Sequence, residues 1–386
     1  MRFPARPLAA VLLVGSLSAH AGVAGSYRVT DLGNFFPTGV NDSAWVSAYD
    51  GRALLWRPGI GVVDLGDFGG RGACSNRANA INNAGQVAGF TWSAAETAYR
   101  AFRWQEGTGL LDLGDIEGGA RASRAEALNA YGLAAGQATG QWNSHPVYGF
   151  LSFGHAARFD LPGPPLDLEL HPDGTLLSIA RGINDAGATA GERQTSDGWR
   201  AIVWDESASP LNLGALWGIN GSGATTDSFA RDINNLGQVA LRLPLGGGAH
   251  TAAIWQAGVG FTTIGQLDGY NTAANAINDA GVLVGVADAV GAFGTQAFAW
   301  SEADGLVALT SRVDVASSGD WAVLDTTGIS ESGLIVGRGW RADLGYRAVL
   351  LSPVPEPATA VLVGLGALLL VARAACGGRG REHLAS

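Results

Sequence analysis

The polar side chains that recur most regularly in this sequence are asparagines. Most precede a Gly by three residues, as in Ile81-Asn82-Asn83-Ala84-Gly85. The column consists of Asn41, Asn82, Asn129, Asn184, Asn234 and Asn278, with Ser330 in the seventh place. These residues could ring a channel and bind a ligand, whereas an Asn in such a turn can also bond its own backbone. Because every copy keeps the position, a requirement of the fold is the favoured interpretation.

Other residue types that support catalysis or metal binding lack the necessary spacing. Acidic turns such as Asn184-Asp185 and Asn278-Asp279 do not have the dense alternating oxygens of a calcium loop. The histidines show no metal-binding spacing, and Gly221-Ser222-Gly223 lacks the frame of a nucleophile elbow. Cys74 has no recognisable His partner. The sequence therefore predicts no catalytic residue, no metal and no cofactor.

Tryptophans recur in step with the asparagines. An apolar run in successive copies ends in Trp56, Trp104, Trp204, Trp255 and Trp300, with Ser152 and Leu351 in copies three and seven. These rings could form a sugar-stacking platform, but a fixed strand position favours packing between neighbouring sheets. Nine residues after the tryptophans come Leu65, Leu113, Leu213, Ile264 and Leu309. A constant spacing across a Gly-containing turn predicts a β-hairpin.

These columns define seven repeats, 41 to 55 residues apart, which begin at Val40, Ile81, Leu128, Ile183, Ile233, Ile277 and Ile329. Each repeat reads as four short strands, which is typical of a propeller blade. Residues 22–353 are therefore expected to form an all-β, seven-bladed β-propeller of four-stranded blades. The seventh copy ends at Leu351 before its fourth strand, so the strand from Tyr27 to Gly33 is expected to complete it and close the ring. The Pro-rich connection from Asp160 to Thr175 interrupts the repeat and is a further candidate binding region.

The composition is typical of a turn-rich all-β protein. Charged residues make up 15% of the chain, and there are 58 glycines, whereas typical domains are about 25% charged. Between the two terminal segments, 19 basic and 32 acidic residues leave a net charge near −13. All basic residues are arginines and none cluster, so nucleic acid is not an expected partner.

Residues 1–21 have the layout of a cleavable signal peptide. Arg2 and Arg6 precede a short apolar run, and the small residues Ala19 and Ala21 suit signal peptidase, with cleavage expected after Ala21. The alternative is an uncleaved anchor or a buried N-terminal helix.

The C-terminal segment 354–386 has the layout of an anchor. An uncharged stretch, 358–372, spans about 22 Å as a helix, which makes it a marginal transmembrane segment. The arginines behind it should act as a stop-transfer signal and stay in the cytoplasm, which places everything upstream outside it. The residues concerned are Val354, Pro355, Glu356 and Pro357 before the stretch, and Arg373, Arg379 and Arg381 after it.

This tail resembles the PEP-CTERM sorting signal of Gram-negative bacteria, which is recognised by exosortase, a membrane-embedded cysteine transpeptidase. The repeats resemble the extracellular HAF-repeat family, as in Ala101-Phe102-Arg103-Trp104 followed by Leu113-Gly114. The resemblance implies an inner-membrane-anchored precursor, processing by exosortase, and a product at the cell surface or outside the cell.

The resemblance also implies a non-catalytic role as a binding or structural component of the extracellular polysaccharide matrix. The alternative is an enzyme, a polysaccharide lyase or glycosidase acting in the propeller channel, because fold does not fix function. Convergent carboxylates or a His-Arg-Tyr group at one channel mouth would favour the enzyme. A channel lined by small and apolar side chains would favour the binding module.

Overall fold

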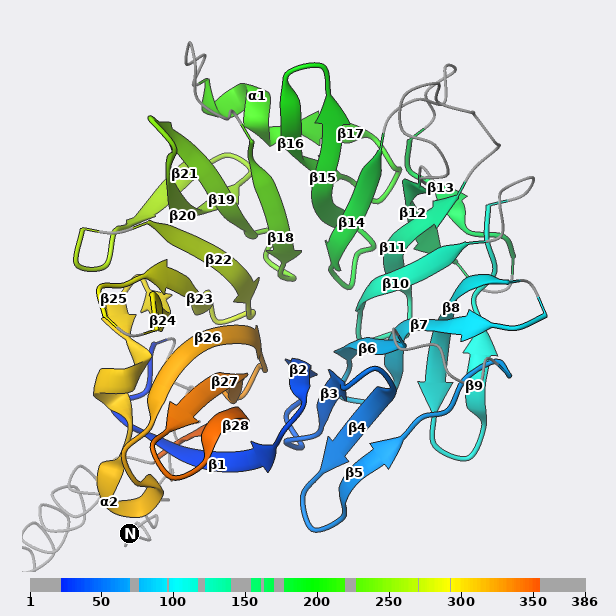
Figure 1. Cartoon of the computed structure of the whole chain (residues 1–386). Coiled ribbons are helices and arrows are strands. Elements are labelled where there is room, and N and C mark those ends of the chain that lie inside the picture. The colour runs from blue at the N-terminus through cyan, green and yellow to red at the C-terminus, as the bar shows by residue number, and fades with distance from the viewer. Residues whose placement is uncertain are drawn as a thin grey trace, which may run out of the picture.

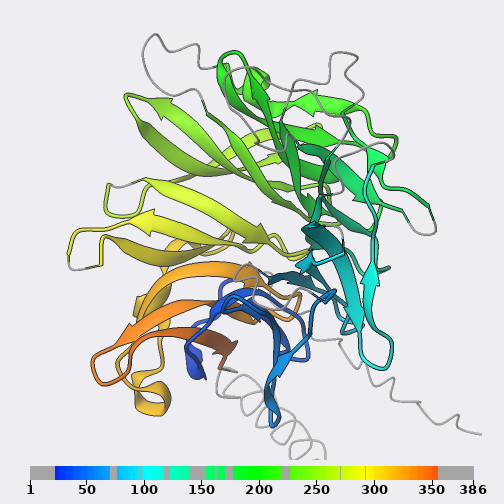
Figure 2. The ribbon, with the colours of Figure 1, turned by 45° about the vertical axis from the view of Figure 1, so that its right-hand side comes forward.

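Seven four-stranded antiparallel sheets surround a central opening and follow one another in chain order (Figure 1). The computed structural model describes residues 22–69, 76–95, 97–116, 122–139, 154–160, 163–169, 177–218, 227–269, 271–291 and 293–354. This arrangement confirms the predicted seven-bladed β-propeller. Each sheet extends outward from the strand nearest the axis (Figure 2).

The seven blades are numbered from the N-terminus, and each contributes one inner strand next to the axis. The inner strands are β2 (Phe36–Val40), β6 (Arg77–Ile81), β10 (Ser123–Leu128), β14 (Ser178–Ile183), β18 (Phe229–Ile233), β22 (Thr272–Ile277) and β26 (Ala322–Ile329). The second strands are β3 (Val46–Tyr49), β7 (Val87–Ser93), β11 (Ala134–Thr139), β15 (Thr189–Thr195), β19 (Val239–Gly246), β23 (Leu283–Asp288) and β27 (Ile335–Arg341).

The outer half of each blade is a second hairpin. The third strands are β4 (Ala53–Arg57), β8 (Ala98–Gln105), β12 (Gly154–Phe159), β16 (Gly198–Trp204), β20 (Ala249–Gln256), β24 (Thr295–Ser301) and β28 (Gly345–Pro353). The fourth strands are β5 (Gly61–Asp64), β9 (Gly109–Asp112), β13 (Leu166–Asp167), β17 (Pro210–Asn212), β21 (Gly260–Gly265), β25 (Gly305–Ala308) and, in blade 7, β1 (Tyr27–Gly33).

The ring is closed by the N-terminal strand, as predicted. β1 pairs antiparallel with β28, from Tyr27 opposite Pro353 to Gly33 opposite Ala348, and the two strands lie side by side in Figure 1. Beyond the strands, the N–H of Val354 donates to the carbonyl oxygen of Ser26 at 2.9 Å. The pairing covers the edge that β28 would otherwise expose.

Apolar side chains between adjacent blades form the core. Seven clusters of buried residues occur, and each joins two neighbouring sheets. Between blades 3 and 4, for example, Ala156 and Leu168 lie in one cluster with Ile202 and Trp204. Each blade thus buries both faces of its sheet against its neighbours, which is why the strands are rich in Ala, Val, Ile and Leu.

The sequence-based assignment of blade 3 was wrong in register. Its third strand ends at Phe159, which lies opposite Ala134 just as Trp104 lies opposite Val87 in blade 2. Phe159, rather than Ser152, therefore holds the tryptophan place. The connection 140–153, between the second and third strands, is longer than in the other copies. The predicted end of the third strand was therefore placed too early in the chain.

The connection from Asp160 to Thr175 does not simply interrupt the repeat, because it contains the fourth strand β13. Leu168 then occupies the apolar position that follows the tryptophan position by nine residues in the other blades. Its N–H donates to Ala156 at 2.9 Å, as the N–H of Leu113 donates to Ala101 at 3.0 Å in blade 2.

The described residues contain three short helical segments: α1 (Leu213–Trp217), the 3-10 turn η1 (Leu309–Arg312) and α2 (Val315–Ser318). Within the described ranges, no helix is long and apolar enough to cross a membrane. The predicted signal cleavage residues Ala19 and Ala21 lie outside those ranges. So do Pro355, Glu356, Pro357, the segment 358–372, Arg373, Arg379 and Arg381, and only Val354 of the predicted sorting motif is described.

Candidate functional site

All seven inner strands carry a β-bulge three residues before the asparagine column. In β6 the pairing skips the residue between Ala78 and Ala80, and in β10 the residue between Ala125 and Ala127. A bulge re-aims a side chain, and each skipped residue lines the central channel. We call this set the waist; it consists of Thr38, Asn79, Glu126, Arg181, Arg231, Asn275 and Thr327.

The second glycine of the repeat makes room for the bulge. A Cβ at Gly89 would lie 2.0 Å from the carbonyl oxygen of Arg77, and a Cβ at Gly136 would lie 2.0 Å from that of Arg124. No side chain fits at such a distance, so glycine lets the two strands approach. Glycine therefore accommodates the bulge in these blades, whereas blades 1 and 5 form the same bulge opposite Ala48 and Leu241.

The asparagine column lies at one end of the channel, where the inner strands end; we call it the asparagine end. Asn234 Oδ1 accepts the N–H groups of Leu236 at 3.1 Å and Gln238 at 2.9 Å, and Nδ2 donates to the carbonyl oxygen of Asn278 in the next blade at 2.9 Å. The turn-closing role expected from the sequence is thus confirmed. The same side chains also tie the blades together, through Nδ2 contacts of 2.9 to 3.3 Å made by Asn41, Asn82, Asn129, Asn184, Asn234 and Asn278.

Carboxylates at the rim of this end are occupied by neighbouring backbone. The N–H of Ser332 donates to Asp42 Oδ1 at 2.7 Å, and the N–H of Asp279 donates to Glu331 Oε2 at 2.8 Å. Although burial opposes it, hydrogen bonds from Ser332, Ser330 and Asn83 hold the pKa of Asp42 below its usual value. In the part of the chain that the structure describes, no three His, Cys, Asp or Glu side chains form a metal-binding group.

Asp232 stands where the other copies have Gly or Ala. Its Oδ1 accepts the N–H of Ile233 at 2.9 Å, and its Oδ2 accepts the N–H of Ile277 in blade 6 at 3.0 Å. Burial, with a smaller effect of Glu331 and Asp279, raises the pKa of Asp232 to about 7. Asp232 is therefore a carboxyl group that titrates near neutral pH in the channel wall.

The waist is charged on one side. Arg181 Nη1 lies 3.7 Å from Glu126 Oε2, and Arg181 Nε donates to Glu192 Oε1 at 2.9 Å. Arg231 Nη1 lies 3.6 Å from the same Glu192 oxygen, and Glu192 is only 3% exposed. Burial raises the pKa of Glu126 and lowers that of Arg231. Waist side chains line both channel cavities, one of about 410 Å³ at the asparagine end and one of about 420 Å³ at the opposite end.

The opposite end, where the inner strands begin, carries arginines stacked on aromatic rings; we call it the arginine end. Arg338 lies 5.5 Å over the ring of Phe36, which stacks on Tyr49 with centroids 5.2 Å apart and an 18° interplanar angle. Arg77 lies 4.0 Å over Tyr49. Together with Glu126 these residues line the cavity at this end, and Phe36 is 46% exposed.

The stack joins three blades, because Arg338 comes from β27, Phe36 and Tyr49 from β2 and β3, and Arg77 from β6. The next arginine along the ring, Arg124, lies 4.9 Å over Phe90. An aromatic surface with guanidinium groups in a cavity of this size has the character of a ligand-binding site.

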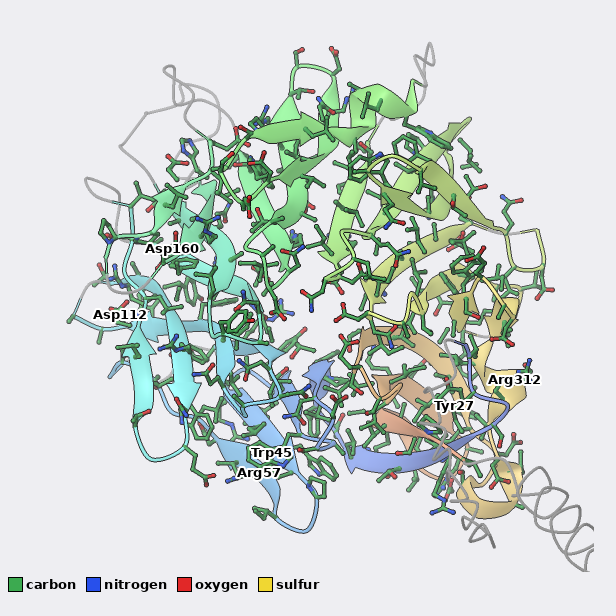
Figure 3. The ribbon with its side chains drawn as sticks, turned by 180° about the vertical axis from the view of Figure 1, so that it is seen from behind. Tyr27, Trp45, Arg57, Asp112, Asp160 and Arg312 are labelled. Atoms are coloured by element: carbon green, nitrogen blue, oxygen red, sulfur yellow. The ribbon has the colours of Figure 1, made fainter. Side chains whose placement is uncertain are left out.

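Other prominent contacts of charged side chains lie away from the channel, as the view from behind shows (Figure 3). Arg57 packs 4.8 Å over Trp45 on blade 1. Asp112 and Asp160 lie at the periphery of blades 2 and 3, where they pair with Arg100 at 3.1 Å and Arg158 at 2.9 Å. These contacts stabilise single blades and do not point into the central opening.

The tryptophan column is confirmed as core. Trp104 and Trp204 are buried, and the remaining members are half-buried against the inter-blade clusters, so these rings form no exposed platform. His155 bonds Asp167 at 2.9 Å outside the channel. Near the predicted signal cleavage site, the N–H of Val23 donates to Asp304 Oδ2 at 2.7 Å.

The sequence-based analysis missed the channel residues. Four of them lie in inner strands that also supply apolar residues to the core, but their own side chains line the channel: Arg77, Glu126, Arg181 and Arg231. A signal was present: the waist is a polar position at a fixed offset before the asparagine column. Which of these residues meet across blades could not be read from one sequence.

No protein-family model and no curated protein matches the chain. Among solved structures, TolB from Acinetobacter baumannii is 14% identical, with a TM-score of 0.41 over 69% of this chain and 63% of TolB. An arginine-to-alanine triple mutant of AofleA from Arthrobotrys oligospora is 10% identical, with a TM-score of 0.34 over 86% of this chain and 91% of that one. Dipeptidyl peptidase 4 from Porphyromonas gingivalis is 11% identical, with a TM-score of 0.31 over 85% of this chain and 46% of the peptidase.

These similarities carry no functional assignment. The class that the described residues define is a seven-bladed β-propeller, closed by its N-terminal strand, with a polar channel.

Proposed function

We propose that this chain is an exported, non-catalytic β-propeller that binds polysaccharide of the extracellular matrix at the arginine end of its channel. The observation that carries the proposal is the stack of Arg338, Phe36, Tyr49 and Arg77 along one open cavity of about 420 Å³. Sugar residues offer hydroxyl groups for arginine donors and apolar C–H faces for aromatic side chains, and the cavity volume falls within the range of small-ligand sites.

The asparagine end is the less suitable end for a ligand. Its amides and rim carboxylates are already engaged in bonds between blades, such as those from Asn234 to Asn278 and from Ser332 to Asp42. A ligand there would have to replace hydrogen bonds that hold the ring together, and each replacement would cost part of its binding energy.

Export and sorting complete the proposal. The segment 1–21 and the tail 354–386 support secretion through signal peptidase and transient anchoring in the inner membrane. Exosortase then cleaves near Pro355 and releases or displays the propeller. Intact-mass spectrometry tests this in a host that has exosortase: the mature protein should begin at Gly22 and end near Pro355. A variant with Pro355, Glu356 and Pro357 changed to Ala should keep its tail, and identical uncut tails in both proteins would reject the sorting step.

An enzyme is the second candidate, because carboxyl groups converge at the asparagine end. Asp232, Asp279 and Glu331 all line that cavity, and a pKa of about 7 at Asp232 suits a general acid. Both Asp232 oxygens, however, already accept backbone N–H groups. Release of reducing ends from a polysaccharide, abolished by Asp232→Asn, would favour the enzyme over the binding module.

A glycan array probed with residues 22–353 tests the binding proposal, since this range contains the whole closed ring. We expect binding to matrix-type polysaccharides that is weakened by Tyr49→Ala and unchanged by Tyr131→Ala. Tyr131 is a matched control because it is 79% exposed at the tip of the turn after Asn129. Absence of binding to any glycan, or equal loss in both variants, would reject the site.

A further inference from the structure

Arg77 lines the cavity at the arginine end and has no acidic partner at ion-pair distance among the described residues. It begins the inner strand β6 and lies 4.0 Å over the Tyr49 ring, and its Nε is buried without a hydrogen-bond partner. Within the described ranges, no carboxylate lies at ion-pair distance from it, whereas Arg338 in the same cavity pairs with Asp325 at 2.7 Å. A partly buried charge without a counter-charge in contact is unfavourable, so this position favours a ligand that carries a negative charge.

The acids nearby are committed elsewhere. Glu126, which lines the same cavity, accepts from Asn79 Nδ2 at 3.2 Å and faces Arg181 at 3.7 Å. Asp325 accepts two bonds from the Arg338 guanidinium, at 2.9 Å and 2.7 Å, and one from the Arg338 backbone N–H at 3.0 Å. Glu126 attracts Arg77 only at a range longer than an ion pair, so Arg77 has no carboxylate in contact at the cavity wall.

From this geometry we propose that Arg77 anchors the carboxylate of a uronic-acid residue in the bound polysaccharide, an inference that rests on the binding function proposed above. A carboxylate would give Arg77 an acidic partner in contact, and its two oxygens match the guanidinium fork. The Tyr49 ring lies against the guanidinium on one side, which limits the movement of the guanidinium before the ligand binds. The Tyr49 and Phe36 rings also line the cavity beside it and offer contact area to the sugar ring.

The rest of the surface favours this localisation. With 19 basic and 32 acidic residues between the terminal segments, the propeller repels an acidic polymer overall. An acidic chain should therefore bind only where a guanidinium is uncompensated.

The test measures binding of a hexamer of galacturonic acid and of the same hexamer after reduction of its carboxyl groups to alcohols. Titration calorimetry is carried out on the full chain in detergent micelles. We expect the acidic hexamer to bind about tenfold or more tightly than the reduced one, which is the factor expected for a charge-assisted hydrogen bond pair. Arg77→Gln should abolish this preference, and Arg77→Lys, which keeps the charge without the fork, should restore only part of it.

Arg28→Gln is the matched control, since it removes one arginine charge from an exposed position of the outer strand β1. It should leave the preference unchanged. Equal binding of both hexamers by the unaltered protein, or the same effect of Arg77→Gln and Arg28→Gln, would overturn the uronate inference while leaving glycan binding intact. Binding of neither hexamer, together with a blank glycan array, would instead remove the proposed function itself. The comparison of hexamers on the unaltered protein needs no variant to fold.

Discussion

Replacing Asn234 by Ala should weaken the propeller by an amount that the structure lets us work out. The Asn234 side chain is 4% exposed and bonds three backbone groups: the N–H of Leu236, the N–H of Gln238 and the carbonyl oxygen of Asn278. Each buried hydrogen bond contributes about 1 kcal/mol. The loss in the free energy of unfolding should therefore be about 3 kcal/mol, which corresponds to roughly 4 °C in melting temperature for a chain of this size.

Ser330 offers an internal comparison, because in blade 7 a serine holds the same place. Its Oγ accepts the N–H of Leu334 at 3.2 Å, as Asn234 Oδ1 accepts the N–H of Gln238. Asn234→Ser should keep this bond and lose the other two, so the loss should be about two-thirds of that in the Ala variant, about 2 kcal/mol.

Urea unfolding followed by tryptophan fluorescence measures these differences. Leu236→Ala is the control, because Leu236 lies in the same turn with its side chain 57% exposed, and it should change stability by less than about 0.5 kcal/mol. A loss below about 1 kcal/mol for Asn234→Ala, or equal losses for the Ala and Ser variants, would refute the view that these amides link the blades.

Three further predictions concern closure, pH and the ligand site. Deleting Tyr27 to Gly33 removes three buried apolar side chains, Tyr27, Val29 and Leu32, and should cost about 6 kcal/mol; an unchanged melting curve would show that β1 does not close the ring. Folding raises the pKa of Asp232 from 3.8 to about 7, so its contribution to stability is greatest below pH 4, falls as the pH rises to 7 and is constant above. Asp232→Ala should remove this slope from unfolding curves measured between pH 4 and 8, and an identical slope in both proteins would contradict the assignment. Glu126→Gln removes a negative charge from the arginine-end cavity and should tighten binding of the galacturonate hexamer about two- to fivefold, whereas weaker binding would mean that Glu126 itself contacts the ligand.

The parts of this molecule that were predictable from sequence are those set by local geometry. The Asn-x-x-Gly turn and the nine-residue hairpin spacing recur in most blades, because these strand pairs meet within their own repeat. The unpaired strand from Tyr27 to Gly33 then predicted closure with blade 7. The prediction for blade 3 was wrong for a local reason too. The longer connection 140–153 separates β11 from β12, so the sequence pattern did not identify Phe159 as the equivalent of the tryptophans.

The candidate site depends on distances between blades, which a single sequence does not contain. Arg77 and Tyr49 are far apart in the chain, and their contact at 4.0 Å follows only from the way blade 2 packs on blade 1. Glu126 and Arg181 likewise meet through bulges in two different inner strands. The asparagine column was visible as a repeat, but its bonds to the next blade required the ring.

A crystal structure of the propeller with a bound galacturonate hexamer tests the central claim most directly. The account predicts electron density for the saccharide in the cavity lined by Phe36, Tyr49 and Arg77, with a carboxylate within hydrogen-bonding distance of the Arg77 guanidinium. Density at the asparagine end near Asp232 or on the outer faces of the blades, with the arginine end empty, would contradict it.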